Sequence, residues 1–399
     1  MRAGLGLALL FTSLVSEAGE IESRSSLIQP EALEPLLARG DLALIETTGE
    51  QLKQVLLLAP VNAPPDQVFD LLMNVEEYPK FVATIGSTLV LRRGGPMLEY
   101  RWKLDVPLIN LQGTRVQRGR RPNLVEVRFS SGNFEGSRER WELYPLEGGK
   151  RTLVACYRAL ETSTGGLVIK TLASLEPTFP AALSVASSFV HLRSIQRFAA
   201  KLPPLPLVAQ KGQVPKFVPL RADSPELARS APFLDLGIFA IIESNQDGTL
   251  RQVALLTKVS ADKKKLLAIV RDAGKYPEFI PNFAKQDVTP IDARRNKLSW
   301  ELEVPFQNLE GEAEMTVEDD GSVEIVNTTG DITRGRFRWE IAEAGASSIP
   351  IHYTYSDVRE ASFFTKMLIE RQPLVEHGVV IASGTVALTA VKARAEGRR

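Results

Sequence analysis

Apolar and polar residues alternate with a period of two over several short stretches of the chain. In residues 100–106 the even positions are apolar, whereas Arg101, Lys103 and Asp105 between them are charged. Residues 298–304 repeat this alternation, and shorter alternating runs surround Trp141 and Trp339. Because successive side chains of a strand point to opposite faces, the pattern predicts antiparallel strands with one dry face.

Short helices are predicted near the start of each half of the chain. Pro64-Pro65-Asp66 opens the first one, since proline suits the first helical positions and an acidic residue suits the first turn. Apolar residues at helical spacing follow it, at 68–75 and again at 266–273. Tyr78-Pro79-Lys80-Phe81 is expected to end the helix, because proline restricts the preceding residue to extended geometry.

A long helix is predicted at the end of each half. The first carries an apolar stripe of Val185, Phe189, Leu192, Ile195 and Ala199. The second has no charge between His377 and Lys392, and a helix that is apolar on most sides is a buried one. The order of elements predicts an α+β fold in which a curved antiparallel sheet wraps around the long C-terminal helix. An incomplete fit between sheet and helix would leave a cavity.

The two halves are copies of one another. Trp300 follows Trp102 by 198 residues, and Trp339 follows Trp141 by the same 198. Many neighbours obey this shift, among them Tyr78-Pro79-Lys80-Phe81 with Tyr276-Pro277-Glu278-Phe279, Gly113 with Gly311, Gly132 with Gly330, Arg140 with Arg338, Glu142 with Glu340 and Tyr157 with Tyr355. A single register over so many positions predicts a tandem duplication of one domain.

The duplication and the segments between the copies define the expected domains. Residues 1–18 resemble a signal peptide, with Arg2, an apolar run and the small-x-small site Ser16-Glu17-Ala18. Domain 1 is expected at 41–202 and domain 2 at 237–396. Residues 203–236 hold many prolines and are expected to form an extended, semi-rigid linker without a helix. We therefore expect an exported protein, periplasmic or secreted, with no transmembrane segment once the signal is cleaved.

The composition of the chain argues against several classes of function. Lys plus Arg and Asp plus Glu both number 48, so no overall positive charge would attract nucleic acid. The single cysteine, Cys156, cannot form an internal disulfide and is best explained as a small buried apolar residue. The three histidines, His191, His352 and His377, have no counterparts at the 198-residue shift and no metal-ligand spacing. We expect neither a metal nor a cofactor.

Charged residues that both copies share lie beside the tryptophans. Arg138, Arg140 and Glu142 are two apart in a strand, so they are expected together on the face opposite Trp141. Cross-strand ion pairs on the solvent side, with Glu126 and Glu324 as partners, are the expected role of this set. The sequence contains no phosphate-binding glycine loop, His-Glu-x-x-His or Gly-x-Ser-x-Gly. No catalytic residue is therefore predicted.

The dry face and the long helices supply the candidate binding residues. Tryptophans on an apolar sheet face either fill a core or line a cavity, and the sequence leaves both readings open. The residues expected to line the cavity are Trp102, Leu104, Trp141, Phe189, Trp300, Leu302, Trp339 and Val380.

The helix followed by Tyr78-Pro79-Lys80-Phe81, its second copy at Tyr276–Phe279 and the long C-terminal helices resemble the START-like superfamily, which includes bacterial polyketide cyclases and coenzyme Q-binding proteins. The resemblance covers nearly all of both copies. It implies a helix-grip fold with a lipid, quinone or polycyclic ligand held between sheet and helix.

Three functions remain open at this point. The first is non-catalytic binding or transport of a lipid, an isoprenoid quinone or a polycyclic compound in the cell envelope. The second is a cyclase, dehydratase or hydrolase acting on a hydrophobic substrate in the same cavity, which requires an Asp, Glu, Arg or His that points inward. The third is an interaction scaffold with filled cores. Because the recognisable charges are expected to point outward, we favour the first.

Overall fold

The computed structural model describes residues 20–48, 51–82, 85–104, 111–175, 179–202, 214–220, 224–304, 307–357 and 375–398. The predicted signal peptide and residues 203–213 and 221–223 of the predicted linker lie outside these residues.

The first repeat runs from α1 to α5. Its elements are α1 (Pro30–Leu37), β1 (Asp41–Thr48), β2 (Gln51–Val61), α2 (Pro65–Met73), the 3₁₀ turn η1 (Val75–Glu77), α3 (Tyr78–Phe81), β3 (Ile85–Gly94), β4 (Met97–Leu104), β5 (Gln112–Arg120), β6 (Leu124–Gly132), β7 (Arg138–Leu146), η2 (Glu147–Gly149), β8 (Arg151–Ala159), α4 (Gly166–Leu175) and α5 (Phe179–Ala199).

The second repeat runs from α6 to α10. Its elements are α6 (Pro225–Leu234), β9 (Gly237–Ser244), β10 (Leu250–Leu256), α7 (Lys263–Arg271), η3 (Ala273–Lys275), α8 (Tyr276–Phe279), β11 (Phe283–Pro290), β12 (Arg295–Val304), β13 (Gln307–Val317), β14 (Val323–Gly330), β15 (Gly335–Ala344), β16 (Ser347–Ser356) and α10 (Val375–Ala395).

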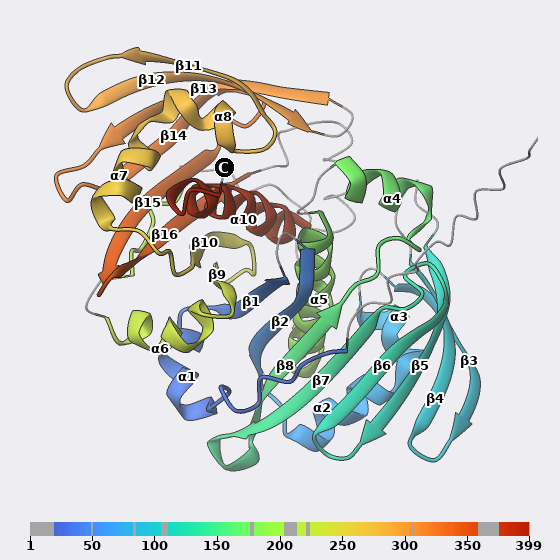
Figure 1. Ribbon diagram of the computed structural model, residues 1–399. Helices are drawn as coiled ribbons and strands as arrows, with labels where there is room; N and C mark the ends of the chain where they lie inside the picture. Colours follow the sequence, from blue (N-terminus) through green and yellow to red (C-terminus); the bar gives the residue numbers. More distant parts are fainter. Residues whose placement is uncertain are drawn as a thin grey trace, which may run out of the picture.

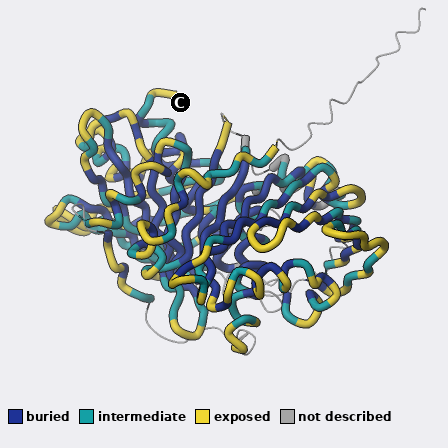
Figure 2. Tube along the Cα trace, turned by 90° about the horizontal axis from the view of Figure 1, so that it is seen from below, coloured by how far each residue is buried: buried dark blue, intermediate teal, exposed yellow. Residues whose placement is uncertain are grey.

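Each repeat is an antiparallel sheet that curves around its long final helix, so the predicted α+β helix-grip fold is confirmed (Figure 1). The sheets are joined edge to edge into one 16-stranded sheet through the antiparallel pair β1 and β9. The long helices α5 and α10 pack against their own sheets and against each other. The strands in the middle of the molecule are buried along most of their length, whereas loops carry most of the exposed residues (Figure 2).

The junction between the repeats is symmetric. In the β1–β9 pair Ala43 lies opposite Ala240, with Leu42 opposite Ile241 on one side and Leu44 opposite Phe239 on the other. Two glycines flank it at equivalent places: a Cβ on Gly40 would lie 2.2 Å from the carbonyl oxygen of Ile242, and one on Gly237 would lie 2.1 Å from that of Ile45. The close approach of the two backbones therefore requires glycine in both repeats.

The predicted register of the duplication is wrong after β7. Tyr157 lies opposite Arg140, and the residue opposite Arg338 is Tyr353 rather than Tyr355. The connection between β15 and β16 is two residues shorter than that between β7 and β8, so the shift falls from 198 to 196. The long helices obey this second shift, because both span 21 residues and begin 196 residues apart.

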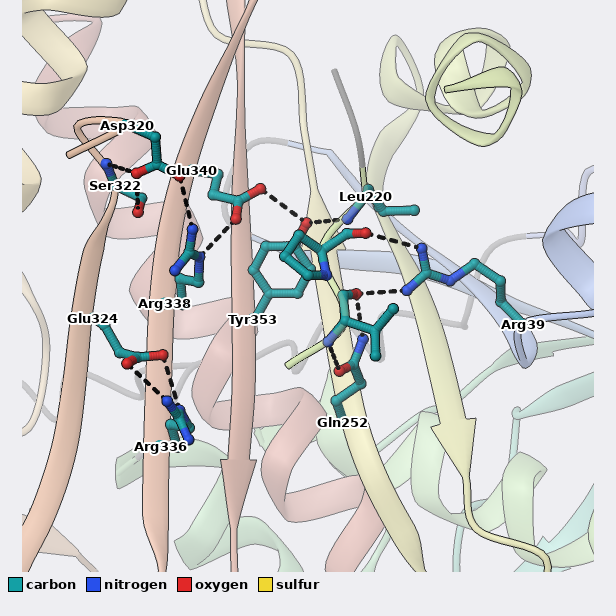
Figure 3. Close-up of polar contacts among 12 residues, drawn as sticks. Arg39, Leu220, Gln252, Asp320, Ser322, Glu324, Arg336, Arg338, Glu340 and Tyr353 are labelled. Atoms are coloured by element: carbon teal, nitrogen blue, oxygen red, sulfur yellow. Dashed lines mark hydrogen bonds and ion pairs between the residues drawn. The ribbon is translucent and has the colours of Figure 1, made fainter. Parts of the chain in front are cut away.

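The segments that precede α1 and α6 lie across the outer face of the sheet, which is the face opposite α5 and α10. The backbone N–H of Arg24 donates to the Tyr157 hydroxyl at 2.9 Å, and that of Leu220 donates to the Tyr353 hydroxyl at 2.7 Å. The expected outer-face ion pairs are present beneath them: Arg140 donates to Glu126 at 2.8 Å, and Arg336 and Arg338 bind Glu324 and Glu340 (Figure 3).

Two expectations about prolines are wrong. The linker contains α6, because Pro225 occupies a first-turn position and the Ser224 hydroxyl caps the helix by accepting from the N–H of Leu227 at 3.2 Å. Tyr78–Phe81 does not end α2 but forms its own short helix, with Pro79 in its first turn. The Tyr78 hydroxyl donates to the Leu72 carbonyl at 2.5 Å, which ties this short helix to the end of α2.

The second long helix is buried as predicted. α10 contacts β10 and β16 of its own sheet and also α5. By length and composition its span Glu376–Ala395 could also cross a membrane, and half of that span is buried inside the protein. Its apolar character is accounted for by this packing.

Candidate ligand-binding site

The inner face of the first repeat, which faces α5, carries charged residues that the sequence did not lead us to expect there. On β7, Glu139 lies two residues before Trp141 and therefore shares its face. Arg158 on β8 lies directly opposite Glu139, and Arg115 points inward from β5. The exposed fractions are 8% for Arg115, 2% for Glu139 and 5% for Arg158. Three charged groups thus lie in the interior of the repeat.

These charged groups form one cluster. The Arg158 Nη2 donates to the Glu139 Oε1 at 2.6 Å, and the Arg158 Nη1 donates to the Ser187 hydroxyl on α5. The Arg115 Nη1 lies 3.9 Å from the same Glu139 oxygen. The guanidinium carbon of Arg115 lies 4.1 Å from the Phe129 ring centroid and 4.8 Å from the Trp102 ring centroid. Aromatic faces therefore shield the cluster from solvent.

The helix contributes a polar stripe to the same space. Ser184, Ser187, Ser188 and His191 are spaced three and four residues apart, so they share one face of α5. The His191 ring lies between two aromatic rings, with centroids 5.1 Å from Tyr78 and 4.8 Å from Trp141, and meets both edge to face. Polar groups of the sheet and of α5 thus face each other, and aromatic side chains enclose the space between them.

The ionisation of the cluster follows from burial and neighbouring charges. Burial alone would raise the pKa of Glu139, but Arg158 and Arg115 outweigh it and hold the pKa of this carboxyl below its ordinary value. Burial lowers the pKa of His191 to about 3. Burial raises the pKa of Tyr78 and Tyr100. At neutral pH the cluster therefore contains one carboxylate, two guanidinium ions and a neutral imidazole.

Several buried polar atoms of this cluster have no hydrogen-bond partner among the described residues. They are the Arg115 Nε, the Arg158 Nε, the His191 Nε2, the Ser184 and Ser188 hydroxyls and the Trp102 Nε1. Buried polar groups are nearly always hydrogen-bonded, and leaving one unpaired costs roughly 1–3 kcal/mol. Their gathering between one sheet and one helix marks this place as the candidate binding site.

The second repeat lacks this cluster. The positions of Arg115, Glu139 and Arg158 are taken by Ala313, Phe337 and Thr354, and those of Ser184, Ser188 and His191 by Val380, Gly384 and Ala387. His352 occupies the place of Cys156 and stacks on Trp339, with ring centroids 3.9 Å apart. Burial lowers the pKa of His352 to about 3, so its ring is neutral.

The predicted cavity residues fall into three groups. Trp102 and Trp141 border the polar cluster, whereas Phe189 faces α10 and stacks on His377 with centroids 4.6 Å apart. Trp339 and Val380 are buried in the second repeat. Leu104 of β4 in the first repeat, and Trp300 and Leu302 of β12 in the second, are only partly buried. Trp102 and Trp300 lie against Gly113 and Gly311, close enough that a Cβ there would meet the indole. That the eight line a cavity stays a prediction.

A cavity of about 290 Å³ lies elsewhere, beside the outer face of the second repeat. Its lining includes Leu220, Lys263, Asp320, Arg338 and Glu340. The Arg338 Nη2 lies 3.0 Å from Asp320, its Nε donates to Glu340 at 2.6 Å, and the Tyr353 hydroxyl donates to Glu340 at 3.2 Å (Figure 3). Because these polar groups are paired with one another, we do not assign a binding site here.

Sequence reasoning could have found the inner charges. Trp141 marks the dry face of β7, and Glu139 is two residues away on that face. Comparison of the repeats shows Phe337 at its place, so Glu139 is a charge that the duplication does not share. The charges that the two repeats do share, Arg140 with Arg338 and Glu142 with Glu340, lie on the outer face. Cys156 is buried as predicted, and burial raises the pKa of its thiol to about 12.

In the described part of the chain, no three His, Cys, Asp or Glu side chains gather as metal ligands.

Three solved structures illustrate what this chain is similar to. The di-domain ARO/CYC StfQ from the steffimycin biosynthetic pathway is 14% identical with a TM-score of 0.32, over 86% of this chain and 98% of that one. The di-domain ARO/CYC BexL from the BE-7585A biosynthetic pathway is 15% identical with a TM-score of 0.30, over 87% and 99%. The STAR-related lipid transfer protein (fragment 25–204) from Xanthomonas axonopodis is 14% identical with a TM-score of 0.32, over 41% and 94%. No curated protein matches the chain.

The comparison with protein-family models identifies the family of this chain. The model described as "Polyketide cyclase / dehydrase and lipid transport" matches residues 61–180 and again residues 259–372, which together are more than half of the chain. The START-like resemblance and the tandem duplication predicted from the sequence are thereby confirmed. The chain belongs to the polyketide cyclase / dehydrase and lipid transport family and contains two copies of its domain.

Proposed function

We propose that the first repeat binds a hydrophobic molecule, such as a lipid, an isoprenoid quinone or a polycyclic compound, between its sheet and α5 without transforming it. The observation that carries this proposal is the set of unpaired polar atoms inside an aromatic surround. Ligand sites are mostly apolar, with a few converging polar groups that orient the ligand. The inner face of the first repeat has this composition.

The buried charges of the first repeat also bear on the alternative that the protein is an enzyme. It required an inward-facing acid, base or cation, and Arg115, Glu139, Arg158 and His191 all point inward. Proton transfer, however, is most effective when the pKa of the group lies near the working pH. The pKa of Glu139 is held below its ordinary value and that of His191 lies at about 3. The ionisation states therefore favour binding over acid–base catalysis.

The proposal is tested by extracting the protein, purified from its native envelope, with organic solvent and analysing the extract by mass spectrometry. A matched pair of variants locates the ligand, because Ser184 of α5 and Val380 of α10 occupy equivalent buried places. We expect an apolar ligand in the wild type, its loss in Ser184→Phe and its retention in Val380→Phe. Thermal unfolding shows whether each variant is folded.

Two outcomes would count against non-catalytic binding. If no ligand is recovered and no lipophilic probe binds, the repeats are better described as an interaction scaffold with filled cores. If the bound molecule changes mass during incubation with the protein, the enzyme alternative replaces the proposal.

We also propose that the protein is exported, on the strength of the signal-like residues 1–18. Cell fractionation with N-terminal sequencing is the test. A mature chain that begins after Ala18 in the periplasm or medium supports export, and an uncleaved chain in the cytoplasm contradicts it.

A further inference from the structure

The buried cluster of the first repeat carries an excess of positive charge. Arg115 and Arg158 are cationic, and in the part of the chain that the structure describes Glu139 is the one carboxylate that both approach. The other titratable groups that face this space, Tyr78, Tyr100 and Cys156, are uncharged at neutral pH because burial raises the pKa of each. His191 is neutral as well. The cluster therefore has a net charge of about +1 by this count.

The other buried carboxylates among the described residues have partners of their own. Asp41 has its Oδ2 2.9 Å from the Arg193 Nε at the junction of the repeats, and Glu161 accepts from the backbone N–H of Ser163 at 2.9 Å. The outer-face carboxylates Glu126 and Glu142 are bound to Arg140. An uncompensated charge inside a protein is costly, so a second anion in this space would be stabilised.

The donors needed to hold such an anion are present. A guanidinium carries five N–H donors in a planar fork that matches a carboxylate. The Arg115 Nε and the Arg158 Nε have no acceptor among the described residues, and the hydroxyls of Ser184 and Ser188 are also unpaired. The aromatic rings of Trp102, Phe129 and Trp141 form the apolar part of the surround.

We propose that the ligand of the first repeat is an apolar carboxylic acid, bound with its carboxylate at Arg115 and Arg158 and its apolar body along the aromatic rings. This inference rests on the proposed function and specifies the ligand class. A carboxylate contributes one negative charge and neutralises the cluster. A phosphate monoester carries about −1.5 to −2 at neutral pH and would exceed it. The second repeat has Ala313 and Thr354 at the two arginine positions and offers no such anchor.

The test compares a pyrene-labelled fatty acid with its methyl ester, which has the same apolar body but no charge. Their dissociation constants are measured by fluorescence for the wild type, Arg115→Met and Arg140→Met. Arg115→Met removes one positive charge but leaves the Arg158–Glu139 pair intact, and methionine preserves packing against Phe129 and Trp102. Arg140→Met is the matched control, because it removes the same charge from the outer face.

We expect the wild type to bind the acid at least about tenfold more tightly than the ester, as a charge-assisted hydrogen bond would give. Arg115→Met should weaken binding of the acid by about the same factor and leave the ester unchanged, whereas Arg140→Met should change neither. Equal affinity for acid and ester in the wild type overturns this inference but leaves the proposed function intact. If neither compound binds the wild type, the proposed function itself fails.

Discussion

The two repeats share a backbone plan but differ in what lies between sheet and helix. In the first repeat Arg115, Glu139 and Arg158 meet a polar stripe of α5. In the second, Ala313, Phe337 and Thr354 stand at the same places, and the facing helix offers Val380, Gly384 and Ala387. A Cβ on Gly384 would lie 2.5 Å from Leu255, so this helix packs closely against its sheet. The outer faces, by contrast, share the ion pair between Arg140 and Glu142, which recurs as Arg338 and Glu340, although Glu126 pairs with Arg140 and its counterpart Glu324 with Arg336.

This difference separates what the fold needs from what a ligand needs. The outer-face arginines and glutamates, the Trp–Gly contacts and the tyrosine that ties the short helix recur in both repeats, so they serve the common architecture. The buried charges of Arg115, Glu139 and Arg158 occur only in the first repeat, where the Nε atoms of the two arginines have no hydrogen-bond acceptor among the described residues. The second repeat also has buried polar atoms without a partner among the described residues, on Ser348, His352 and Thr354, but no charged group at these three places. The charged cluster is therefore the reason why we propose ligand binding for the first repeat rather than the second.

Glu139→Gln should have the largest effect. The substitution leaves two buried guanidinium groups without their counter-ion, and breaking a buried pair in this way costs about 3–5 kcal/mol. Glu126→Gln, on the outer face of the same repeat, breaks a solvent-accessible pair with Arg140 and should cost under about 1 kcal/mol. Urea unfolding gives both values. Equal costs would show that the interior of the first repeat is no more sensitive to charge than its outer face.

The dependence of stability on pH should be shared by the two repeats. His191 and His352 both have a pKa of about 3 when folded, below the ordinary value of 6.5. Between these values the unfolded chain binds protons that the folded chain does not, so stability falls as the pH drops from about 6.5 towards 3. Each histidine contributes a slope of up to about 1.4 kcal/mol per pH unit.

His191→Phe and His352→Phe should each make this acid destabilisation less steep in unfolding experiments at a series of pH values. A slope that neither substitution changes would mean that both rings are protonated in the folded protein. If only one of the two substitutions reduced the slope of stability against pH, only that repeat would contain a histidine that is buried in its neutral form.

Ser184→Ala and Val380→Ala should have effects of opposite sign. The Ser184 hydroxyl is buried without a partner, so its removal should raise the free energy of unfolding by roughly 1 kcal/mol in the ligand-free protein. Val380 is buried among apolar groups, and its truncation should lower that free energy by roughly 2 kcal/mol. Thermal unfolding measures both shifts. A loss of stability in Ser184→Ala would show that this hydroxyl is bonded, and would weaken the distinction between the repeats.

Regular patterns in the sequence predicted most of the fold. The alternation at 100–104 and 298–304 corresponds to β4 and β12, and the apolar runs near the end of each half correspond to α5 and α10. The predictions that were wrong concern local exceptions. A capping serine allowed α6 to form in a proline-rich stretch, and a shorter turn before β16 changed the register of the duplication from 198 to 196.

The candidate site was harder to predict because it is assembled across the sheet. Period two places Glu139 on the face of Trp141, but nothing local shows that Arg158 lies opposite it or that Arg115 approaches from β5. The polar stripe of α5 adjoins its apolar stripe, and the prediction for this helix rested on the apolar residues alone. Pairing between strands, rather than the composition of any one strand, created the cluster.

By itself the sequence determined the two helix-grip repeats, since the periods of two and 3.6 residues and the repeated tryptophans depend only on the order of residues along the chain. Only the tertiary structure decided how the repeats join through β1 and β9 and which charges meet inside the first of them. The physical reason is that periodicity assigns a side chain to a face, whereas the register between strands determines its partner. A buried ion pair depends on the partner.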